Sequence, residues 1–281
     1  MRICRFESAD GRVYAGRMVD DRSAHPLEGD LFGDHRFADR ALAITRLLAP
    51  ITPPNIFAIG RNYRAHAEEL GNVAPEQPLI FMKPTTSVIG PDEPIVLPAS
   101  APGEVDYEAE LAIVIGRTAR RVGEADARTY VFGYTCANDV SARDCQRNDK
   151  QWARAKGFDT FCPLGPWIVT ERAFTTGARN DTGTMPEHDP RFNPDQCVVL
   201  SRLNGQVMQN SNTGFMIHSC AKLVSYLSHQ FTLLPGTLIL TGTPEGVGMG
   251  RKPPVFLKSG DTIEVEIAGI GTIRNRAITV E

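Results

Sequence analysis

The sequence predicts a β-rich α+β fold in which a small N-terminal domain precedes a larger domain. The chain has 25 glycines and 20 prolines among 281 residues, and its apolar runs mostly extend for about four to seven residues between turn signals. Segments of this length with few helical patterns between them favour sheets over strict βαβ alternation. A proline-rich run, LLAPITPPN, restricts the backbone and removes amide donors, which suits a domain boundary.

Residues 1–52 are predicted to form the small N-terminal domain. Its short apolar segments Arg2–Phe6 and Arg12–Met18 predict strands, and Asp39–Leu48 is interpreted as a short helix. Residues 53–281 form the second domain.

The second domain is predicted to contain mostly strands. Short β-branched segments between turn formers indicate strands at Asn55–Gly60, Leu79–Met82, Glu108–Ile115, Trp167–Thr170, Leu238–Thr241 and Thr262–Ile267. Helical periodicity predicts helices at Tyr63–Leu70, Ser141–Lys156 and Ile217–Gln230. The polar, turn-rich stretch Phe174–Pro194 is expected to be a surface loop.

Charge and composition exclude several classes of function. Thirty Lys and Arg residues against 33 Asp and Glu give a net charge of −3, which does not favour binding to nucleic acid or to an anionic membrane. The longest aliphatic run, Leu111–Ile115, is too short to cross a bilayer, and the N-terminus has no apolar signal segment. Six scattered cysteines without a C-x-x-C pair indicate free thiols. We therefore expect a soluble, cytoplasmic globular protein.

The segment DYEAELAIVIG, Asp106–Gly116, places two carboxylates on one face of a strand. Side chains alternate along a strand, so Glu108 and Glu110 point the same way, roughly 6.6 Å apart at about 3.3 Å per residue. Two such charges repel unless a cation lies between them, and a hard divalent cation prefers oxygen ligands. The alternative interpretation is a solvated outer face of the sheet.

A second polar group follows the buried segment that begins at Val131. Asn138 and Asp139 are predicted to start a helix, on which Asp139, Arg143 and Gln146 have the spacing i, i+4, i+7 and line one face. Asp139 is then either a third carboxylate ligand, with Arg143 and Gln146 directed at substrate, or a helix N-cap paired with Arg143.

A third candidate is the pair His66 and Glu69, which are i, i+3 on a short predicted helix ended by Gly71. A carboxylate beside an imidazole raises its basicity and fixes its orientation, as a water-activating base requires. Gly60 and Gly71 supply hinges on both sides, so a mobile lid is expected. The alternative is an ordinary surface pair.

The remaining motifs mainly exclude other kinds of site. Lys156 precedes an aromatic, proline-rich turn and is weak evidence on its own. The segment LILTGTPEGVG, Leu238–Gly248, is a buried strand that opens into a glycine-rich turn, but it matches neither G-x-G-x-x-G nor the Walker A pattern. The sequence also lacks a G-x-S-x-G elbow and an H-E-x-x-H zinc helix.

Six motifs, taken in order, resemble those of the fumarylacetoacetate hydrolase family. They are RNYRAHAEE, FMKPTTS, DYEAELAIVIG, ANDVSARDCQ, WARAKGFDTFCPLGPW and LILTGTPEGVG, and the resemblance runs from about Asn55 to the C-terminus. The chain is most similar to bacterial-type members with a small N-terminal domain. The resemblance implies a catalytic domain of mixed β-sheets with few helices, a homodimer, and one Mg²⁺, Mn²⁺ or Ca²⁺ ion held by three carboxylates.

Site residues follow from the motif positions and form three groups. The metal ligands are Glu108, Glu110 and Asp139, the catalytic residues are His66, Glu69, Arg143, Gln146 and Lys156, and the residues expected to bind substrate are Arg61, Tyr63 and Thr243.

The resemblance implies a metal-dependent enzyme, with three functional readings. The first is a hydrolase that cleaves a C–C bond in a 2,4-diketo acid of the acylpyruvate type, with His66 activating water and a metal-bound enolate leaving. The second is a metal-dependent decarboxylase or isomerase of a 2-oxo diacid such as oxaloacetate, which shares the enolate. The third is a homologue that binds ligand without turnover.

Overall fold

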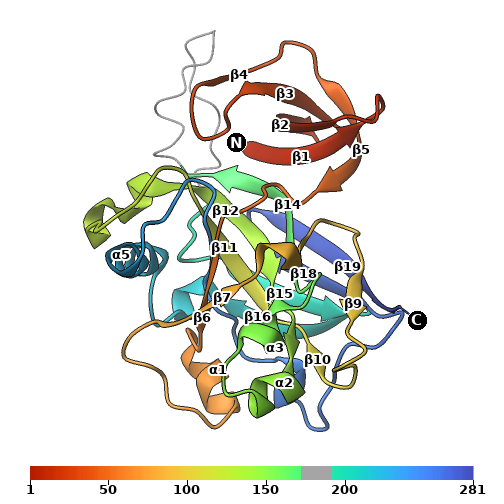
Figure 1. The fold of residues 1–281 in the computed structure, drawn as a ribbon, viewed down its shortest axis with the longest axis vertical. Coiled ribbons are helices and arrows are strands. Elements are labelled where there is room, and N and C mark those ends of the chain that lie inside the picture. The colour runs from red at the N-terminus through yellow and green to blue at the C-terminus, as the bar shows by residue number, and fades with distance from the viewer. Residues whose placement is uncertain (172–191, 281) are drawn as a thin grey trace.

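A large mixed sheet runs through the computed structural model, which describes residues 1–171 and 192–280 (Figure 1). It has 12 strands. In sheet order they are β2 (Val13–Asp20), β3 (Ser23–Gly29), β5 (Leu42–Leu48), β1 (Arg2–Ser8), β14 (Cys162–Thr170), β12 (Val131–Asn138), β11 (Ala109–Ile115), β17 (Leu238–Leu240), β6 (Ile56–Gly60) and β7 (Leu79–Lys83), with β4 (His35–Phe37) on β3 and β8 (Val88–Ile89) on β14.

A second sheet packs against the first, and helices are few and short. The second sheet has the order β16 (Gln206–Asn212), β15 (Val198–Leu203), β18 (Thr262–Ile267), β19 (Gly271–Thr279) and β9 (Ile95–Leu97), while β10 (Val105–Asp106) pairs with β13 (Ser141–Ala142). The α-helices are α1 (Arg64–Glu69), α2 (Arg143–Asn148), α3 (Ala153–Gly157) and α5 (Cys220–Gln230), and the 3₁₀ turns are η1 (Thr85–Ser87), η2 (Glu124–Tyr130), η3 (Thr213–Phe215) and η4 (Gly248–Gly250). The predicted β-rich α+β class is confirmed.

Strand β11 is buried on both faces along its whole length. Leu111 and Ile113 pack in one hydrophobic cluster with α5 and with the inner face of the second sheet. Ala112 and Val114 pack in another cluster, against β6, β14 and β17. The face that carries Glu110 therefore continues into apolar core, and the interpretation of that face as solvated is wrong.

The N-terminal strands extend the central sheet, because β1 pairs antiparallel with β14 through Arg2↔Val169 and Ile3↔Ile168. The predicted helix Asp39–Leu48 is wrong: its last seven residues form strand β5, which pairs with β1. Ile44 and Leu47 pack with the core of this unit. Pairing and packing of this kind override a weak local helix preference.

The predicted helix Ser141–Lys156 is interrupted. Residues 141 and 142 are strand β13, and the rest forms the two short helices α2 and α3. The break follows Asp149, whose carboxylate accepts from Arg154 at 2.6 and 2.5 Å, and Lys150 has the left-handed φ of 59°. A non-glycine residue in that region ends a helix.

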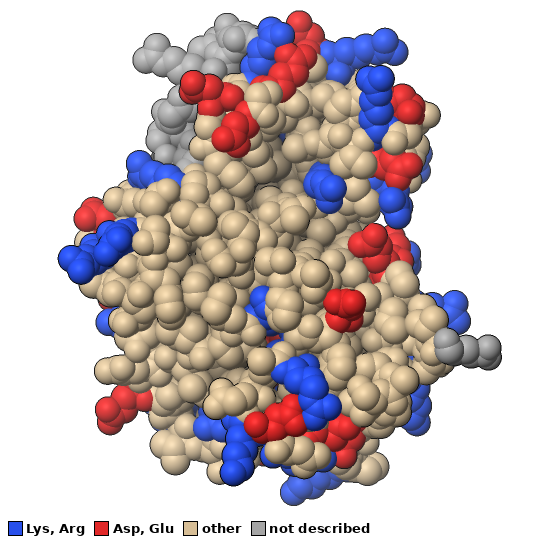
Figure 2. Space-filling model, viewed as in Figure 1, with Lys and Arg blue, Asp and Glu red and all other residues tan. Residues whose placement is uncertain are grey.

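Most of the predicted loop Phe174–Pro194, up to residue 191, lies outside the described residues. On the face shown in Figure 2, basic and acidic side chains are intermixed, and no extended basic patch is visible. Within the described ranges, no helix is long and apolar enough to cross a membrane.

The ends of four neighbouring strands lie together at one end of the central sheet. Strands β6 and β17 are parallel and end side by side, and β11 starts there because it is antiparallel to β17. Strand β12 is antiparallel to β11 and ends there too. Segments far apart in the chain are thus brought together, with α1, α2 and α3 beside them (Figure 1).

We expect Ile113→Ala to lower the free energy of unfolding by about 2–5 kcal/mol, because it leaves a cavity between packed layers. Val13→Ala is the control: this side chain is 47% exposed on β2 and should cost less than about 1 kcal/mol. Urea denaturation measures both. Equal losses would contradict the placement of β11 at the centre of the core.

Candidate active site and metal centre

Three carboxylates meet where β11 begins and β12 ends. Oxygen atoms of Glu108, Glu110 and Asp139 all lie within 4.8 Å of one another, and the three residues are 5%, 1% and 0% exposed. The backbone connects them: the Asp139 amide donates to the Glu108 carbonyl at 2.9 Å, and the Glu108 amide donates to Asn138 Oδ1 at 2.9 Å. Asp139 is not a helix cap, because α2 begins four residues later at Arg143.

Buried cations balance two of these carboxylates. Lys156 Nζ donates to Glu108 Oε2 at 2.7 Å and to Asp139 Oδ2 at 2.6 Å. Lys83 Nζ donates to Asp139 Oδ1 at 2.6 Å and also to the Lys156 carbonyl. Although burial by itself raises the pKa of Glu108, Lys156 and Arg143 together hold that pKa below its ordinary value. Conversely, Asp139 and Glu108 raise the pKa of Lys156 despite its burial.

Glu110 is the exception. Its Oε2 accepts from the Gly242 amide at 2.7 Å, but it forms no ion pair with a lysine or arginine of the described ranges. Burial, reinforced by Asp139 and Glu108, raises the pKa of Glu110 well above its ordinary value. A divalent cation among the three carboxylates would supply the positive charge that Glu110 lacks, and oxygen donors suit Mg²⁺, Mn²⁺ or Ca²⁺. The donor set therefore fits such an ion.

Arg143 belongs to the same network and is 1% exposed. Its guanidinium pairs with Glu108 at 2.7 Å and with Asp106 at 2.9 Å. Nη1 also donates to Gln146 Oε1 at 3.0 Å. Arg143 and Gln146 thus lie together, as their i, i+3 spacing on α2 requires.

The predicted pair on α1 is also brought to the site. His66 is buried, and its Nδ1 lies 3.6 Å from Glu69 Oε2, slightly beyond hydrogen-bond distance. Glu69 is held by the Gly246 amide, which donates to both carboxylate oxygens at 3.0 and 3.1 Å. Such hydrogen bonds are often long before substrate binds. The helix is therefore closed onto the turn that follows β17.

Thr243 lies beside the site with its hydroxyl already engaged. Thr243 Oγ1 donates to the Ala109 carbonyl at 2.9 Å and accepts from Gln209 Nε2 at 2.7 Å. A carboxylate bound at Thr243 would have to compete for this hydroxyl proton. Tyr63 is more remote. It does not line the cavity that opens onto Glu108, and its buried hydroxyl has no hydrogen-bond partner within the described residues.

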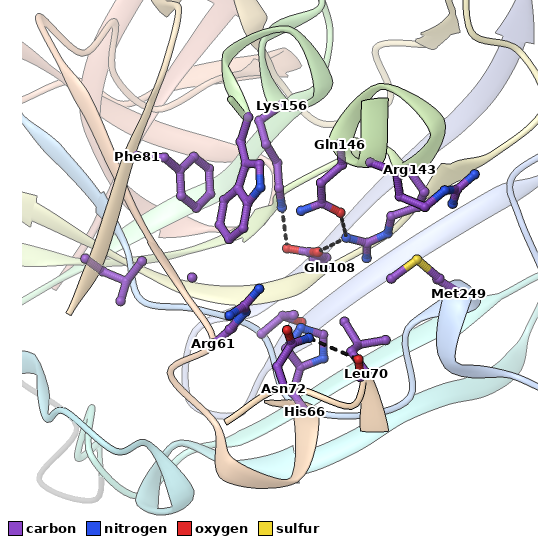
Figure 3. A pocket seen from close by; sticks show the side chains of 15 residues that line it. Arg61, His66, Leu70, Asn72, Phe81, Glu108, Arg143, Gln146, Lys156 and Met249 are labelled. Carbon is purple, nitrogen blue, oxygen red and sulfur yellow. Dashed lines mark hydrogen bonds and ion pairs between the residues drawn. The ribbon is translucent and has the colours of Figure 1, made fainter. Parts of the chain in front are cut away.

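A cavity of about 210 Å³ opens onto Glu108 (Figure 3). Lys156, Gln146 and Arg143 lie on one side of Glu108, and Arg61 and His66 on the other. The lining residues are Ile59, Gly60, Arg61, His66, Leu70, Asn72, Phe81, Glu108, Arg143, Gln146, Arg147, Trp152, Lys156, Thr243 and Met249. A chelating acid of a few carbon atoms bound here would lie between one imidazole and a cluster of cations.

Three site residues escaped the sequence analysis: Lys83, Asp106 and Gln209. Lys83 and Asp106 lie inside the recognised motifs FMKPTTS and DYEAELAIVIG, and the available signal for Lys83 was a charge at the end of the apolar run LIFMK. Gln209 is 1% exposed and also donates to the Pro244 carbonyl at 2.9 Å. It had no sequence signal, since polar residues are common in strands.

Models of known protein families match both parts of the chain. A family model described as "Fumarylacetoacetate (FAA) hydrolase C-terminal" matches residues 55–278, and one described as "Rv2993c-like, N-terminal" matches residues 1–50. The oxaloacetate tautomerase Fahd2a, mitochondrial, of Rattus norvegicus is 43% identical over 82% of this chain and 69% of its own.

The solved structures similar to this protein include two that align with it over its whole length and over the whole of their own chains. A 5-carboxymethyl-2-hydroxymuconate delta-isomerase from Mycobacterium smegmatis has a TM-score of 0.83 at 43% identity. A fumarylacetoacetate hydrolase from psychrophilic Exiguobacterium antarcticum has a TM-score of 0.84 at 35% identity.

We expect Glu110→Gln to weaken Mg²⁺ binding more than about tenfold. Mutation of a residue that only supports a metal ligand already lowers metal affinity by about that factor, and loss of a ligand should lower it further. Glu266→Gln, at a partly exposed pair with Arg202, is the control and should bind as the wild type does. Isothermal titration measures both affinities. Unchanged affinity in Glu110→Gln would remove this carboxylate from the centre.

The same variant should change how stability depends on pH in metal-free protein. Because the pKa of Glu110 is raised in the folded state, the stability it contributes is fully present below its unfolded pKa and is lost as pH rises towards the folded pKa. Glu110→Gln removes that loss, so its stability relative to wild type should increase with pH. Urea unfolding in chelator at several pH values measures this, and a constant difference would contradict it.

Proposed function

This chain belongs to the fumarylacetoacetate hydrolase family, and on that premise we propose that it is a divalent-metal-dependent keto–enol tautomerase or isomerase of a 2-oxo diacid such as oxaloacetate. The observation that carries the proposal is the arrangement around the cavity, in which one histidine faces buried lysine and arginine side chains across Glu108. The tautomerase and isomerase named among its relatives favour this chemistry.

Tautomerisation moves one proton between carbon 3 and the oxygen on carbon 2. Held by Glu108, Glu110 and Asp139, a divalent cation would supply Lewis acidity that favours negative charge on that oxygen. His66 takes the proton from carbon 3, and the imidazolium then supplies a proton to the oxygen, so that no other reactant is consumed.

The surrounding residues support this transfer. Glu69 stabilises the imidazolium and orients its ring. Lys156 and Arg143 add positive charge on the opposite side of the cavity, where it stabilises the enolate oxygen.

Arg61 supports a diacid as the substrate. The other cationic side chains in the lining have carboxylate partners: Arg143 with Asp106 and Glu108, Lys156 with Glu108 and Asp139, and Arg147 with Glu104. Arg61 has none within the described ranges and lies over the Trp152 ring at 5.9 Å. Its φ is 56°, a strained value for arginine that recurs at functional sites. A second substrate carboxylate would complete this charge balance.

The second candidate is hydrolysis of a C–C bond in a 2,4-diketo acid, favoured by the name of the family model and by the Exiguobacterium structure. His66 would then remove a proton from water instead of from carbon. Products separate the candidates: a tautomerase converts the enol of oxaloacetate to the keto form without loss of carbon, a decarboxylase releases CO₂, and a hydrolase yields pyruvate and a second acid.

We expect His66→Ala to lower kcat for oxaloacetate tautomerisation by roughly 10²–10⁴, the usual size of a general acid–base contribution, with Mg²⁺ affinity retained. His229→Ala, on the exposed side of α5, is the control. The enol absorbance followed with Mg²⁺ measures the rate, and acetylpyruvate is assayed in parallel. A near-wild-type rate of His66→Ala on both substrates would exclude this histidine from the chemistry.

We expect Arg61→Gln to raise KM for oxaloacetate by about 10- to 100-fold, since a hydrogen bond to a charged group is worth about 1.5–3 kcal/mol. KM for 2-oxobutanoate, which lacks the second carboxylate, should change little. Deuterium exchange at carbon 3, followed by NMR, measures both substrates. Arg64→Gln, an exposed neighbour at the start of α1, is the control. Equal changes for the two acids would contradict the assignment.

A further inference from the structure

Asp106 is a fully buried carboxylate that none of the proposed catalytic steps uses. We infer that it is a positioning residue that joins Arg143 to the helix carrying His66 and Glu69, so that both sides of the cavity adopt their closed arrangement together. This inference rests on the proposed function for the roles of His66 and Arg143, but the contacts that carry it do not depend on the substrate.

One side of the connection is Arg143. Asp106 Oδ2 accepts from Arg143 Nε at 2.9 Å, and Nη2 of the same guanidinium is also 2.9 Å from that oxygen. This pairing directs Nη1 towards Glu108 and Gln146. The backbone fixes the geometry, since Asp106 pairs with Ser141 across β10 and β13, two residues before Arg143.

The other side is the turn of residues 246–250. Asp106 Oδ1 accepts from the Gly248 amide at 2.7 Å, and Oδ2 accepts from the Met249 amide at 2.9 Å. A Cβ on Gly248 would lie 2.6 Å from Asp106 Oδ1, so the close approach requires glycine here.

The same turn holds α1 closed. The Gly246 amide donates to Glu69, and a Cβ on Gly250 would clash with the Glu69 carboxyl group. The Gly246 amide, which holds Glu69, and the Gly248 amide, which binds Asp106, are separated by a single residue. A shift of this turn would therefore change the environment of Glu69 and with it the orientation of His66.

An asparagine, which is similar in size to aspartate, could not accept the hydrogen bonds that Asp106 accepts. Oδ1 accepts from the Gly248 and Tyr107 amides, and Oδ2 accepts from Arg143 and the Met249 amide. An asparagine has one acceptor oxygen, so in either orientation its NH₂ group would face two donors. It would also leave the buried Arg143 with Glu108 as its one carboxylate partner among the described residues.

The test compares Asp106→Asn with Asp149→Asn in the full-length protein. Asp149 also accepts two hydrogen bonds from an arginine, Arg154, but does not contact the turn. In Asp106→Asn we expect faster amide hydrogen exchange in residues 64–72 and in residues 245–251 together. We also expect kcat to fall about 10- to 100-fold, the usual effect of removing a residue that supports a site, with a much smaller change in KM. Asp149→Asn should match the wild type in all of these.

A folded Asp106→Asn variant with wild-type exchange in residues 64–72 would overturn the inference, as would one with wild-type kcat. If the variant does not fold, the wild type provides the test. Adding Mg²⁺ with oxalate, a small chelating dianion, should slow exchange in residues 64–72 and 245–251 together, and protection of the first segment alone would overturn the inference. Absence of tautomerase activity in the wild type would instead refute the proposed function, while the exchange measurements would remain informative.

Discussion

Burial of four carboxylates where the interior strands of the central sheet end is the constraint on which the rest of the site depends. Asp106, Glu108, Glu110 and Asp139 are each no more than 5% exposed. An ionised carboxylate cannot be taken out of water without a cation or hydrogen-bond donors close by, because the desolvation penalty amounts to several kcal/mol per ion. Buried lysine and arginine side chains and backbone amides compensate this burial, and among the described residues Glu110 is the carboxylate of the four without a lysine or arginine partner.

The turn after β17 supplies most of those amides. Gly242 donates to Glu110, and Gly248 and Met249 donate to Asp106, while Gly246 of the same turn donates to Glu69 on α1. A side chain at any of the three glycines would collide with neighbouring atoms, and at Gly242 and Gly246 φ is +97°. A glycine-rich segment that matches neither nucleotide-binding pattern thus brings amide donors close to carboxylates of the protein itself. The same short segment connects the carboxylate cluster, the α1 helix and, through Asp106, Arg143.

This architecture explains how one family can include proteins named for hydrolysis, isomerisation and tautomerisation. All three reactions need negative charge to develop on an oxygen beside a cation, and the buried network provides for that charge without reference to the rest of the substrate. In the proposed mechanism, the reactions would differ in the atom from which His66 removes a proton and in the substrate group that occupies the far side of the cavity. Arg61, which has no carboxylate partner in the described ranges, lines the same cavity and is the side chain proposed to bind that group.

The sequence by itself determined the periodic features. Glu108 and Glu110 share a face because strand side chains alternate, and His66 and Glu69 meet because helical neighbours recur every three to four residues. Tertiary structure decided what local pattern cannot encode. Residues 42–48 became a strand because β1 offered a partner, and Lys83 reached Asp139 across 56 residues of chain. The charge of a buried site is balanced by groups from several strands, and which groups those are depends on how the sheet is assembled.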